Sequence, residues 1–372
     1  MQLSPFKLER YFARYEFQAR YMFSSSDCES LTIGDLLALE PGAAEGFQRH
    51  WLGYTESLGA PSLRRAVSQV YTQVSPEQVL VYSGAEEAIF ISMHAALSAG
   101  DHVVVQTPCY QSLFEVARSL GCDVTPWEVR FTDGGWALDP DELARLLRPQ
   151  TRLVVINSPH NPTGYHMPQA MFRQVNELTQ ARGIRLFSDE VYRELEYAPA
   201  DRLPAAADIN PLSVSLGVMS KTYGLAGLRI GWIATQDAAF YDRMAALKDY
   251  TTICSSAPSE FLAEVALRHR AQIARRNLDI IGHNLDVLDA FFASRPDLFV
   301  WRRPKAGPIA FPRLLGQDVE AFCHDVVTQA SVMVVPGTIF DHRQNHFRVG
   351  FGRRNLPEAL ARLADFLAKR PA

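Results

Sequence analysis

The sequence of 372 residues has few features of a secreted or membrane protein. Its five cysteines are scattered and form no C-x-x-C pair, which favours free thiols in a reducing compartment over a disulfide framework or a zinc site. No apolar run is long enough to span a bilayer, and charged residues interrupt the N-terminus where a secretory signal would lie. We therefore expect a cytoplasmic protein that does not insert into membranes.

The sequence also has no excess of charge of one sign. A formal net charge of −4 gives no electrostatic footprint for nucleic acid. No G-x-G-x-x-G follows the first strand-like run, as a dinucleotide-dependent oxidoreductase would require. His342 and His346 are four residues apart, but a predicted strand and the absence of an acidic partner argue against a metal site. We therefore expect neither a nucleic-acid partner nor a metal.

The length is too great for one small core, so a large domain with a smaller second one is expected. Strand-like runs alternate with helical patterns, which predicts an α/β fold whose sheet is mostly parallel. These runs are 79–82, 102–106, 152–156, 185–188, 213–218 and 230–234. A long helical stretch (258–293) and four short strand-like runs predict a C-terminal α/β domain. Apolar residues at helical spacing within 1–23 predict an N-terminal helix on the small domain or on a partner subunit.

Lys221 follows the buried strand-like run 213–218. Because desolvating an ammonium is costly, burial there lowers the pKa of the lysine and makes its neutral amine available as a nucleophile. Gly224 and Gly227 let the backbone approach a bulky group, and Arg229 supplies a fixed positive charge. A nucleophilic lysine beside an anion anchor fits pyridoxal phosphate held as a Schiff base.

Three motifs resemble those of one family. They are S-K-T-Y-G-L-A-G-L-R-I-G (220–231), N-P-T-G (161–164) and D-E-V-Y (189–192). The sequence resembles the class I/II aminotransferases, the aspartate-aminotransferase-like group of fold type I. This resemblance implies a large domain with a mostly parallel, seven-stranded-type sheet and a small C-terminal α/β domain. The implied boundaries are 1–35 for an N-terminal arm, 36–270 for the large domain and 271–372 for the small domain. A homodimer with shared active sites is also implied.

The resemblance assigns residues to the cofactor ring. Asp189 would hold the pyridine nitrogen protonated, whereas Asn161 and Tyr192 would hydrogen-bond the phenolate oxygen at the opposite end. Tyr110 would stack on the ring, since a flat aromatic covers it without competing for its protons. Read without the resemblance, Asp189 could cap a helix and Tyr110 could be plain core.

A second set of residues is expected around the cofactor phosphate. A glycine turn that leads into a helix presents free backbone N–H groups, here those of Gly84, Ala85 and Glu86. The resemblance adds Arg229 and also Tyr54, which would reach across the dimer. Many relatives carry Ser or Thr where this chain has Val218, so Ser220 is the expected substitute.

The resemblance implies substrate contacts at Arg348 and Asn161. The planar guanidinium of Arg348 would form two hydrogen bonds to the substrate α-carboxylate. Gly34 is expected on a strand that runs past the substrate. Asp27 and Glu29, just ahead of it, could meet a cationic side chain or could be solvated loop residues.

The implied activity is transfer of an amino group between an L-amino acid and a 2-oxo acid through Lys221. The same apparatus serves lyases, cyclases and oxidases, and the short N-terminus suggests the branch with capreomycidine synthase and arginine-modifying enzymes. A non-catalytic, effector-sensing domain on this fold is a further alternative.

Overall fold

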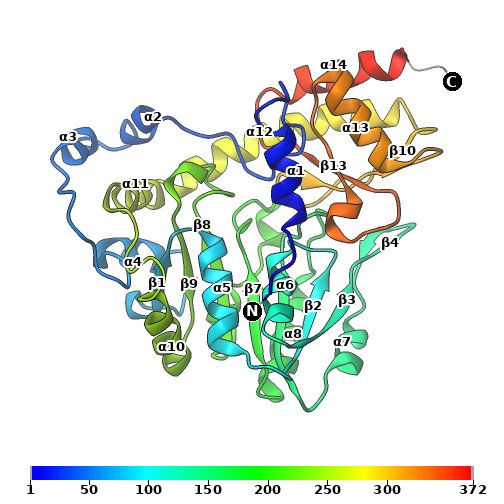
Figure 1. The fold of residues 1–372 in the computed structure, drawn as a ribbon. Coiled ribbons are helices and arrows are strands. Elements are labelled where there is room, and N and C mark those ends of the chain that lie inside the picture. Colours follow the sequence, from blue (N-terminus) through cyan, green and yellow to red (C-terminus); the bar gives the residue numbers. More distant parts are fainter. Residues whose placement is uncertain (1, 370–372) are drawn as a thin grey trace.

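A seven-stranded sheet forms the centre of the computed structural model, which describes residues 2–369 (Figure 1). The strand order is β1-β9-β8-β7-β6-β2-β3. The strands are β1 (Val79–Tyr82), β2 (His102–Thr107), β3 (Asp123–Glu128), β6 (Thr151–Asn157), β7 (Arg185–Asp189), β8 (Ser213–Val218) and β9 (Gly231–Ala234). Neighbouring strands from β3 to β8 are parallel, and β9 is antiparallel to both β8 and β1. The predicted α/β class with a mostly parallel sheet is therefore confirmed.

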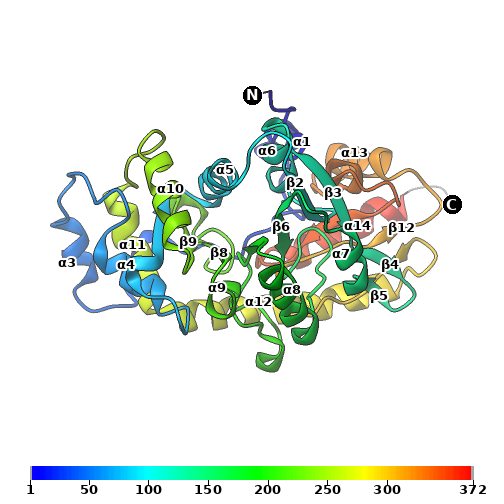
Figure 2. The same ribbon diagram turned by 90° about the horizontal axis from the view of Figure 1, so that it is seen from below.

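Helices cover both faces of this sheet (Figure 2). The helices up to residue 268 are α1 (Lys7–Tyr15), α2 (Ile33–Leu37), α3 (Ala43–Gln48), α4 (Pro61–Ser68), α5 (Ala85–Ala96), α6 (Ser112–Ser119), α7 (Pro140–Leu146), α8 (Gln169–Ala181), α9 (Ala206–Ile209), α10 (Ala238–Lys248) and α11 (Ala257–Arg268). In β6, Val155 packs into one buried cluster and its neighbours Val154 and Ile156 into the opposite one. Because both faces are buried, the strands have almost continuous apolar sequences. None of the helices in residues 2–369 is long and apolar enough to span a membrane.

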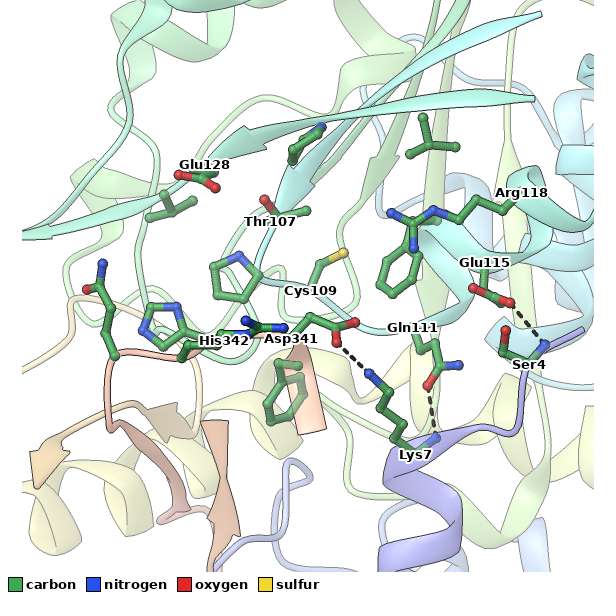
Figure 3. Close-up of a pocket in the computed structure, with 18 of the residues that line it drawn as sticks. Ser4, Lys7, Thr107, Cys109, Gln111, Glu115, Arg118, Glu128, Asp341 and His342 are labelled. Atoms are coloured by element: carbon green, nitrogen blue, oxygen red, sulfur yellow. Dashed lines mark hydrogen bonds and ion pairs between the residues drawn. The ribbon is translucent and has the colours of Figure 1, made fainter. Parts of the chain in front are cut away.

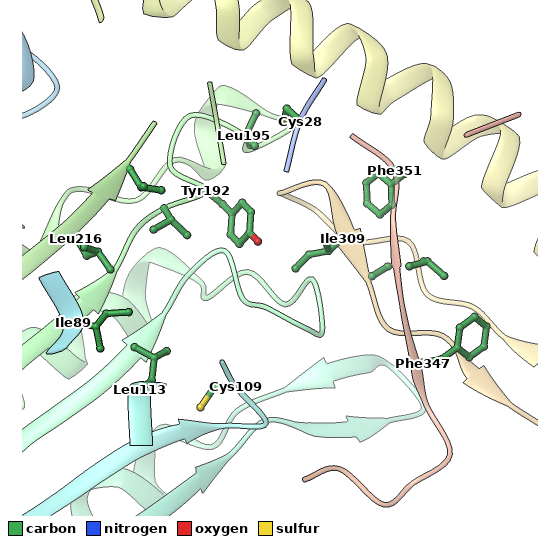
Figure 4. Close-up of a cluster of buried hydrophobic side chains, with 14 of the residues drawn as sticks. Cys28, Ile89, Cys109, Leu113, Tyr192, Leu195, Leu216, Ile309, Phe347 and Phe351 are labelled. Atoms are coloured by element: carbon green, nitrogen blue, oxygen red, sulfur yellow. The ribbon is translucent and has the colours of Figure 1, made fainter. Parts of the chain in front are cut away.

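The C-terminal part (residues 299–369) packs small sheets against three helices. Its strands are β10 (Phe299–Val300), β11 (Ile309–Ala310), β12 (Arg313–Leu314), β13 (Val335–Pro336) and β14 (Phe347–Gly350). The helices are α12 (Arg270–Ala293), which leads into this part, α13 (Val319–Ala330) and α14 (Leu356–Ala368). Many of its apolar side chains belong to the same buried cluster as the central sheet, and Figure 4 shows Tyr192 between Leu216 of the sheet and Ile309. The two parts therefore share one core, and the division at residues 35 and 270 stays a prediction.

Some elements differ from those that the sequence indicates. The stretch 258–293 is two helices, α11 and α12, which meet at His269. Strand β3 and the hairpin β4 (Arg130–Thr132) with β5 (Gly135–Ala137) have no counterpart among the predicted runs. Four single turns of 3-10 helix complete the fold: η1 (Pro76–Gln78), η2 (Pro199–Asp201), η3 (Ala226–Leu228) and η4 (Gly337–Phe340).

Helix α1 packs on the C-terminal part and lies over its junction with the central sheet (Figure 1). Leu8 and Tyr15 are buried there against Phe340 and Val335, and the Tyr11 hydroxyl donates to Val334 O at 2.8 Å. The helix is nine residues long, shorter than the apolar pattern over 1–23. The sequence predicted this helix either on the small domain or on a partner subunit, and in this chain it packs on the C-terminal part.

Gly164 lies where the central sheet and the C-terminal part touch, and its substitution tests that contact. At φ +70° a side chain is strained, and a Cβ would lie 2.6 Å from Ile309 O. Gly183 has φ +63° with nothing within 4 Å of such a Cβ, so it is a matched control. We expect Gly183→Ala to lower the free energy of unfolding by about 1–2 kcal/mol through backbone strain. Gly164→Ala should cost about 1–3 kcal/mol more, because of overpacking. Urea unfolding of the cofactor-free variants measures both, and equal losses would contradict the contact.

Candidate active site

A cavity of about 550 Å³ lies at the carboxyl ends of β6, β7 and β8, beneath α1. Ligands bind at this edge in open α/β sheets, because the loops there leave a crevice. The predicted residues that line it are Ala85, Glu86, Tyr110, Asn161, Asp189, Tyr192, Ser220, Lys221, Arg229 and Arg348. The structure thus brings together residues from segments that lie far apart in sequence.

Lys221 follows β8 and points its amine into this cavity. Its Nζ donates to Ser26 Oγ at 2.9 Å, and burial lowers the pKa of the amine. The negative charges of Asp27 and Asp189 oppose this shift, whereas Arg348 adds to it. Lowering of the pKa increases the share of neutral amine, which is the nucleophilic form.

Asp189 is the last residue of β7 and is buried, with 6% of its surface exposed. Burial raises the pKa of the carboxyl to about 7, although a hydrogen bond from Val191 N and the nearby Lys221 pull it down. Asn157, at the end of β6, donates from Nδ2 to Asp189 O at 3.0 Å and so ties the two strand ends together. A buried carboxyl of this kind suits a cationic partner, which would restore its charged form.

Arg348 on β14 reaches across to the central sheet and is 1% exposed. It donates from Nη1 to Asn161 Oδ1 at 3.1 Å and from Nη2 to Ser24 O at 3.0 Å. Its Nε is buried and has no hydrogen-bond partner within residues 2–369. Burial lowers the pKa of the guanidinium to about 10, so it is still charged at neutral pH and can take an anion.

Two tyrosines form the walls of the cavity. Tyr192 is 1% exposed and lies between the sheet and the C-terminal part (Figure 4). The ring of Tyr110 lies 5.0 Å from the ring of Phe6, at an angle of 49°. An aromatic surface therefore covers one side of the cavity, as a flat ligand would require.

The start of α5 and the guanidinium of Arg229 form a seat for an anion. Gly84 precedes the helix at φ +92°, and a Cβ there would lie 2.4 Å from Arg229 Nη2. A glycine is therefore needed for Arg229 to approach the free N–H groups of Ala85 and Glu86. Ser220 and Val218 also line the cavity. Val218 has no hydroxyl to bind a phosphate, whereas Ser220 has one. The Glu86 carboxylate accepts a hydrogen bond from Ser112 Oγ. Glu86 would therefore contact an anion only through its backbone N–H.

Four predicted residues do not line the cavity: Gly84, which precedes α5 beside it, and Gly34, Glu29 and Tyr54. Gly34 is exposed within α2 and not on a strand, because Thr32 and Asp35 form a capping box that starts a helix there; its substrate role stays a prediction. Glu29 accepts a hydrogen bond from Arg354 N and does not line the cavity. Tyr54 is 89% exposed, away from the cavity of its own chain.

Several residues of the cavity were not recognised in the sequence. They include Ser26, Asn157 and Arg353. Asp27, which the sequence offered as a contact for a cationic side chain, lines the cavity too, but it forms an ion pair with Arg353 at 2.9 Å. The strand-end position of Asn157 could have identified it. Glu9, Phe12 and Glu16 also line the cavity, and their helical spacing was visible in the sequence.

A second cavity, of about 620 Å³, lies beside Ser4 and Lys7 of the N-terminal segment (Figure 3). Two ion pairs involve residues of its lining: Lys7 pairs with Asp341, and Arg130 pairs with Glu142. His342 and His346 lie close by, with His342 Nε2 3.0 Å from His346 Nδ1, among aromatic rings. Within residues 2–369 no group of three or more His, Cys, Asp or Glu side chains could hold a metal.

The residues of the first cavity fit pyridoxal phosphate. Asp189 suits a protonated pyridine nitrogen, and Lys221 suits the aldehyde. Arg229 with the start of α5 suits the phosphate. The buried Nε of Arg348 leaves a donor for a substrate carboxylate.

Known proteins match this chain over nearly its full length. The family model "Aminotransferase class I and II" matches residues 24–364. Capreomycidine synthase of Streptomyces vinaceus is 31% identical over 97% of this chain and 93% of its own length. The arginine–pyruvate transaminase of Pseudomonas aeruginosa is 29% identical over 84% of this chain and 81% of its own.

Two solved structures share the fold closely. A PLP-dependent aminotransferase from Streptococcus suis superimposes with a TM-score of 0.93 at 32% identity, over 100% of both chains. The PLP-dependent cyclase OrfR gives a TM-score of 0.91 at 31% identity, over 100% of this chain and 99% of its own.

The raised pKa of Asp189 predicts a pH dependence of stability in the cofactor-free protein. Between its ordinary value of 3.8 and about 7, the native carboxyl keeps a proton that the unfolded chain has lost. Stability should therefore fall as pH rises through this window, by up to about 1.4 kcal/mol per pH unit, and this decline should be absent from Asp189→Asn. Glu86 and Glu190, whose pKa burial also raises, are common to both proteins and cancel. Urea unfolding from pH 4 to 8 measures the difference; parallel curves would show that Asp189 is already charged.

Proposed function

The chain belongs to the class I and II aminotransferases, which are pyridoxal phosphate enzymes, and from this premise we propose its reaction. It moves an amino group between an L-amino acid and a 2-oxo acid through Lys221. The convergence of Lys221, Asp189 and Arg348 on one cavity is the observation that carries the proposal. An amine, an acid and an anion anchor are the three groups that this exchange needs from the protein.

Each of these residues has a distinct task. Bound pyridoxal phosphate supplies an aldehyde that combines with amines and a ring that accepts the electrons of the Cα–H bond. Arg348, with Asn161 beside it, holds the substrate α-carboxylate and orients Cα. Lys221 Nζ, as a neutral amine, would take the proton from the substrate Cα and later deliver it to the former aldehyde carbon of the cofactor, on the other side of the nitrogen. Asp189 keeps the ring nitrogen protonated during this transfer. Tyr192 and Asn161 hydrogen-bond the ring oxygen.

A second candidate reaction is cyclisation, elimination or oxidation of an arginine-like amino acid. It is favoured because capreomycidine synthase and the cyclase OrfR both match nearly the whole chain. Proton removal by Lys221 is common to these reactions, so the residues that decide between them lie around the substrate side chain.

Spectra of the cofactor-loaded protein, titrated with L-amino acids and followed by mass spectrometry of the products, test the proposed function. We expect conversion to the amine form of the cofactor, with release of a 2-oxo acid and no oxygen uptake. Lys221→Ala should lose the imine absorption band and lower turnover at least about 10⁴-fold, since it removes nucleophile and base together. Ammonia release, oxygen consumption or a cyclic product would instead establish the second candidate.

A homodimer belongs to the same proposal. Trp51, Leu52, Tyr54, Tyr250 and Ile253 are large apolar side chains that are exposed in the single chain. Lys248 Nζ ties their two segments together by donating to Ser57 O and Ile253 O, both at 2.6 Å. An exposed patch of this kind suits a protein interface. We propose that a second copy covers it and that Tyr54 contacts the cofactor phosphate of that copy.

Hybrid dimers test the shared site. Tyr54→Phe should weaken cofactor binding about 10-fold or more, because a hydrogen bond to a charged group is lost. In a hybrid of Tyr54→Phe and Lys221→Ala subunits, the Tyr54→Phe subunit keeps its lysine and receives an intact Tyr54 from its partner. That site should bind the cofactor as tightly as wild type. If the Tyr54→Phe subunit of the hybrid forms the imine but still binds the cofactor weakly, Tyr54 acts within its own chain.

A further inference from the structure

Helix α1 presents two carboxylates and one aromatic ring to the active-site cavity. Glu9 and Phe12 lie on α1, and Glu16 is its C-terminal capping residue; all three line the cavity. Spacings of three and four residues bring side chains to one face of a helix. This face adjoins the buried Leu8, which also lines the cavity, so it is not a plain solvent face.

Hydrogen bonds on both sides hold this helix in place (Figure 3). Ser4 N donates to Glu115 Oε1 and Lys7 N to Gln111 Oε1, both at 2.9 Å, and both acceptors belong to the central part. Lys7 Nζ pairs with Asp341 of the C-terminal part. The start of α1 is thus fixed to the two parts that enclose the cavity, so its acids have a defined position.

The other charges of the cavity have partners. Asp27 is paired with Arg353, and the Glu86 carboxylate is bonded to Ser112. In the proposed function the remaining charged groups meet the cofactor or the α-carboxylate; they are Asp189, Lys221, Arg229 and Arg348. Only Glu9 and Glu16 are then left over from the charged residues that line the cavity.

These two carboxylates make no hydrogen bond or ion pair to any residue within 2–369. Burial raises the pKa of Glu16, and the negative charge of Glu9 raises it further. Two acids therefore line one cavity without an ion pair of their own, although the positive charge of Arg353, which is paired with Asp27, partly offsets the rise in the pKa of Glu16. The buried Arg348, whose Nε is unpartnered, lines the same cavity and offers a seat for a ligand's carboxylate.

We propose that Glu9, Phe12 and Glu16 form a receptor for a cationic substrate side chain, and that the side chain ends in a guanidinium. A guanidinium is planar, has five N–H donors that can serve two carboxylates at once, and stacks on an aromatic face. Because this proposal rests on the proposed function, it names the substrate class of that site. Glu9 and Glu16 determine specificity and do not take part in proton transfer.

Binding of L-arginine and L-citrulline to the cofactor-loaded protein tests the receptor, since the two have the same length but only arginine is charged. Affinity is measured by calorimetry and by the change in cofactor absorbance. We expect wild type to prefer arginine at least about 10-fold, as for hydrogen bonds to charged groups. Glu9→Gln and Glu16→Gln should each reduce the preference, and the double variant should remove most of it. Citrulline affinity should stay the same.

Glu177→Gln is the matched control, because Glu177 is an exposed acid on α8, outside the cavity. It should leave both affinities unchanged, and unchanged thermal midpoints show that every variant folds. Equal binding of the two ligands by wild type, or equal losses for both in the double variant, would overturn the receptor. L-alanine separates the two proposals: if it perturbs the cofactor spectrum while arginine shows no preference, the proposed function stands and the receptor fails. A protein that binds no cofactor would contradict both the proposed function and the receptor.

Discussion

The whole site depends on keeping an amine and a carboxyl group away from water at the ends of neighbouring parallel strands. Lys221 follows β8 and Asp189 ends β7, and burial disfavours the charged form of each. The lysine is thereby kept available as a neutral nucleophile. The acid is kept ready for a cationic partner, which a protonated pyridine nitrogen supplies. Neither effect would survive at the surface, where water would solvate both charges.

This constraint explains the architecture around the site. Parallel strands that are buried on both faces expose only their ends, so the chemistry gathers at their carboxyl edge. The core continues into the C-terminal part, and this brings the buried Arg348 to Asn161. The proposed substrate anchor and the proposed cofactor site thus come from two parts of the chain that share one core.

The sequence allowed many of the residues that line the active-site cavity to be predicted, because they lie in local motifs at strand ends. Asp189, Asn161 and Lys221 follow apolar runs that a pattern reveals. The substrate side was predicted less well. Gly34 was assigned to a strand, although the Thr32–Asp35 capping box starts a helix there. Glu9 and Glu16 were visible only as charges on an amphipathic segment. Their place over the cavity depends on packing of α1 across distant parts of the chain, and no local pattern encodes that packing.

The central claim is that Lys221 carries the cofactor, and borohydride reduction of the loaded protein followed by peptide mapping tests it most directly. Lys248 is the competing site, since it is also buried and burial lowers its pKa. Its amine already donates to Ser57 O and Ile253 O, so it should not react. We predict one pyridoxyl phosphate adduct per chain, on the peptide that contains Lys221. An adduct on Lys248, or no stable adduct at all, would contradict this account.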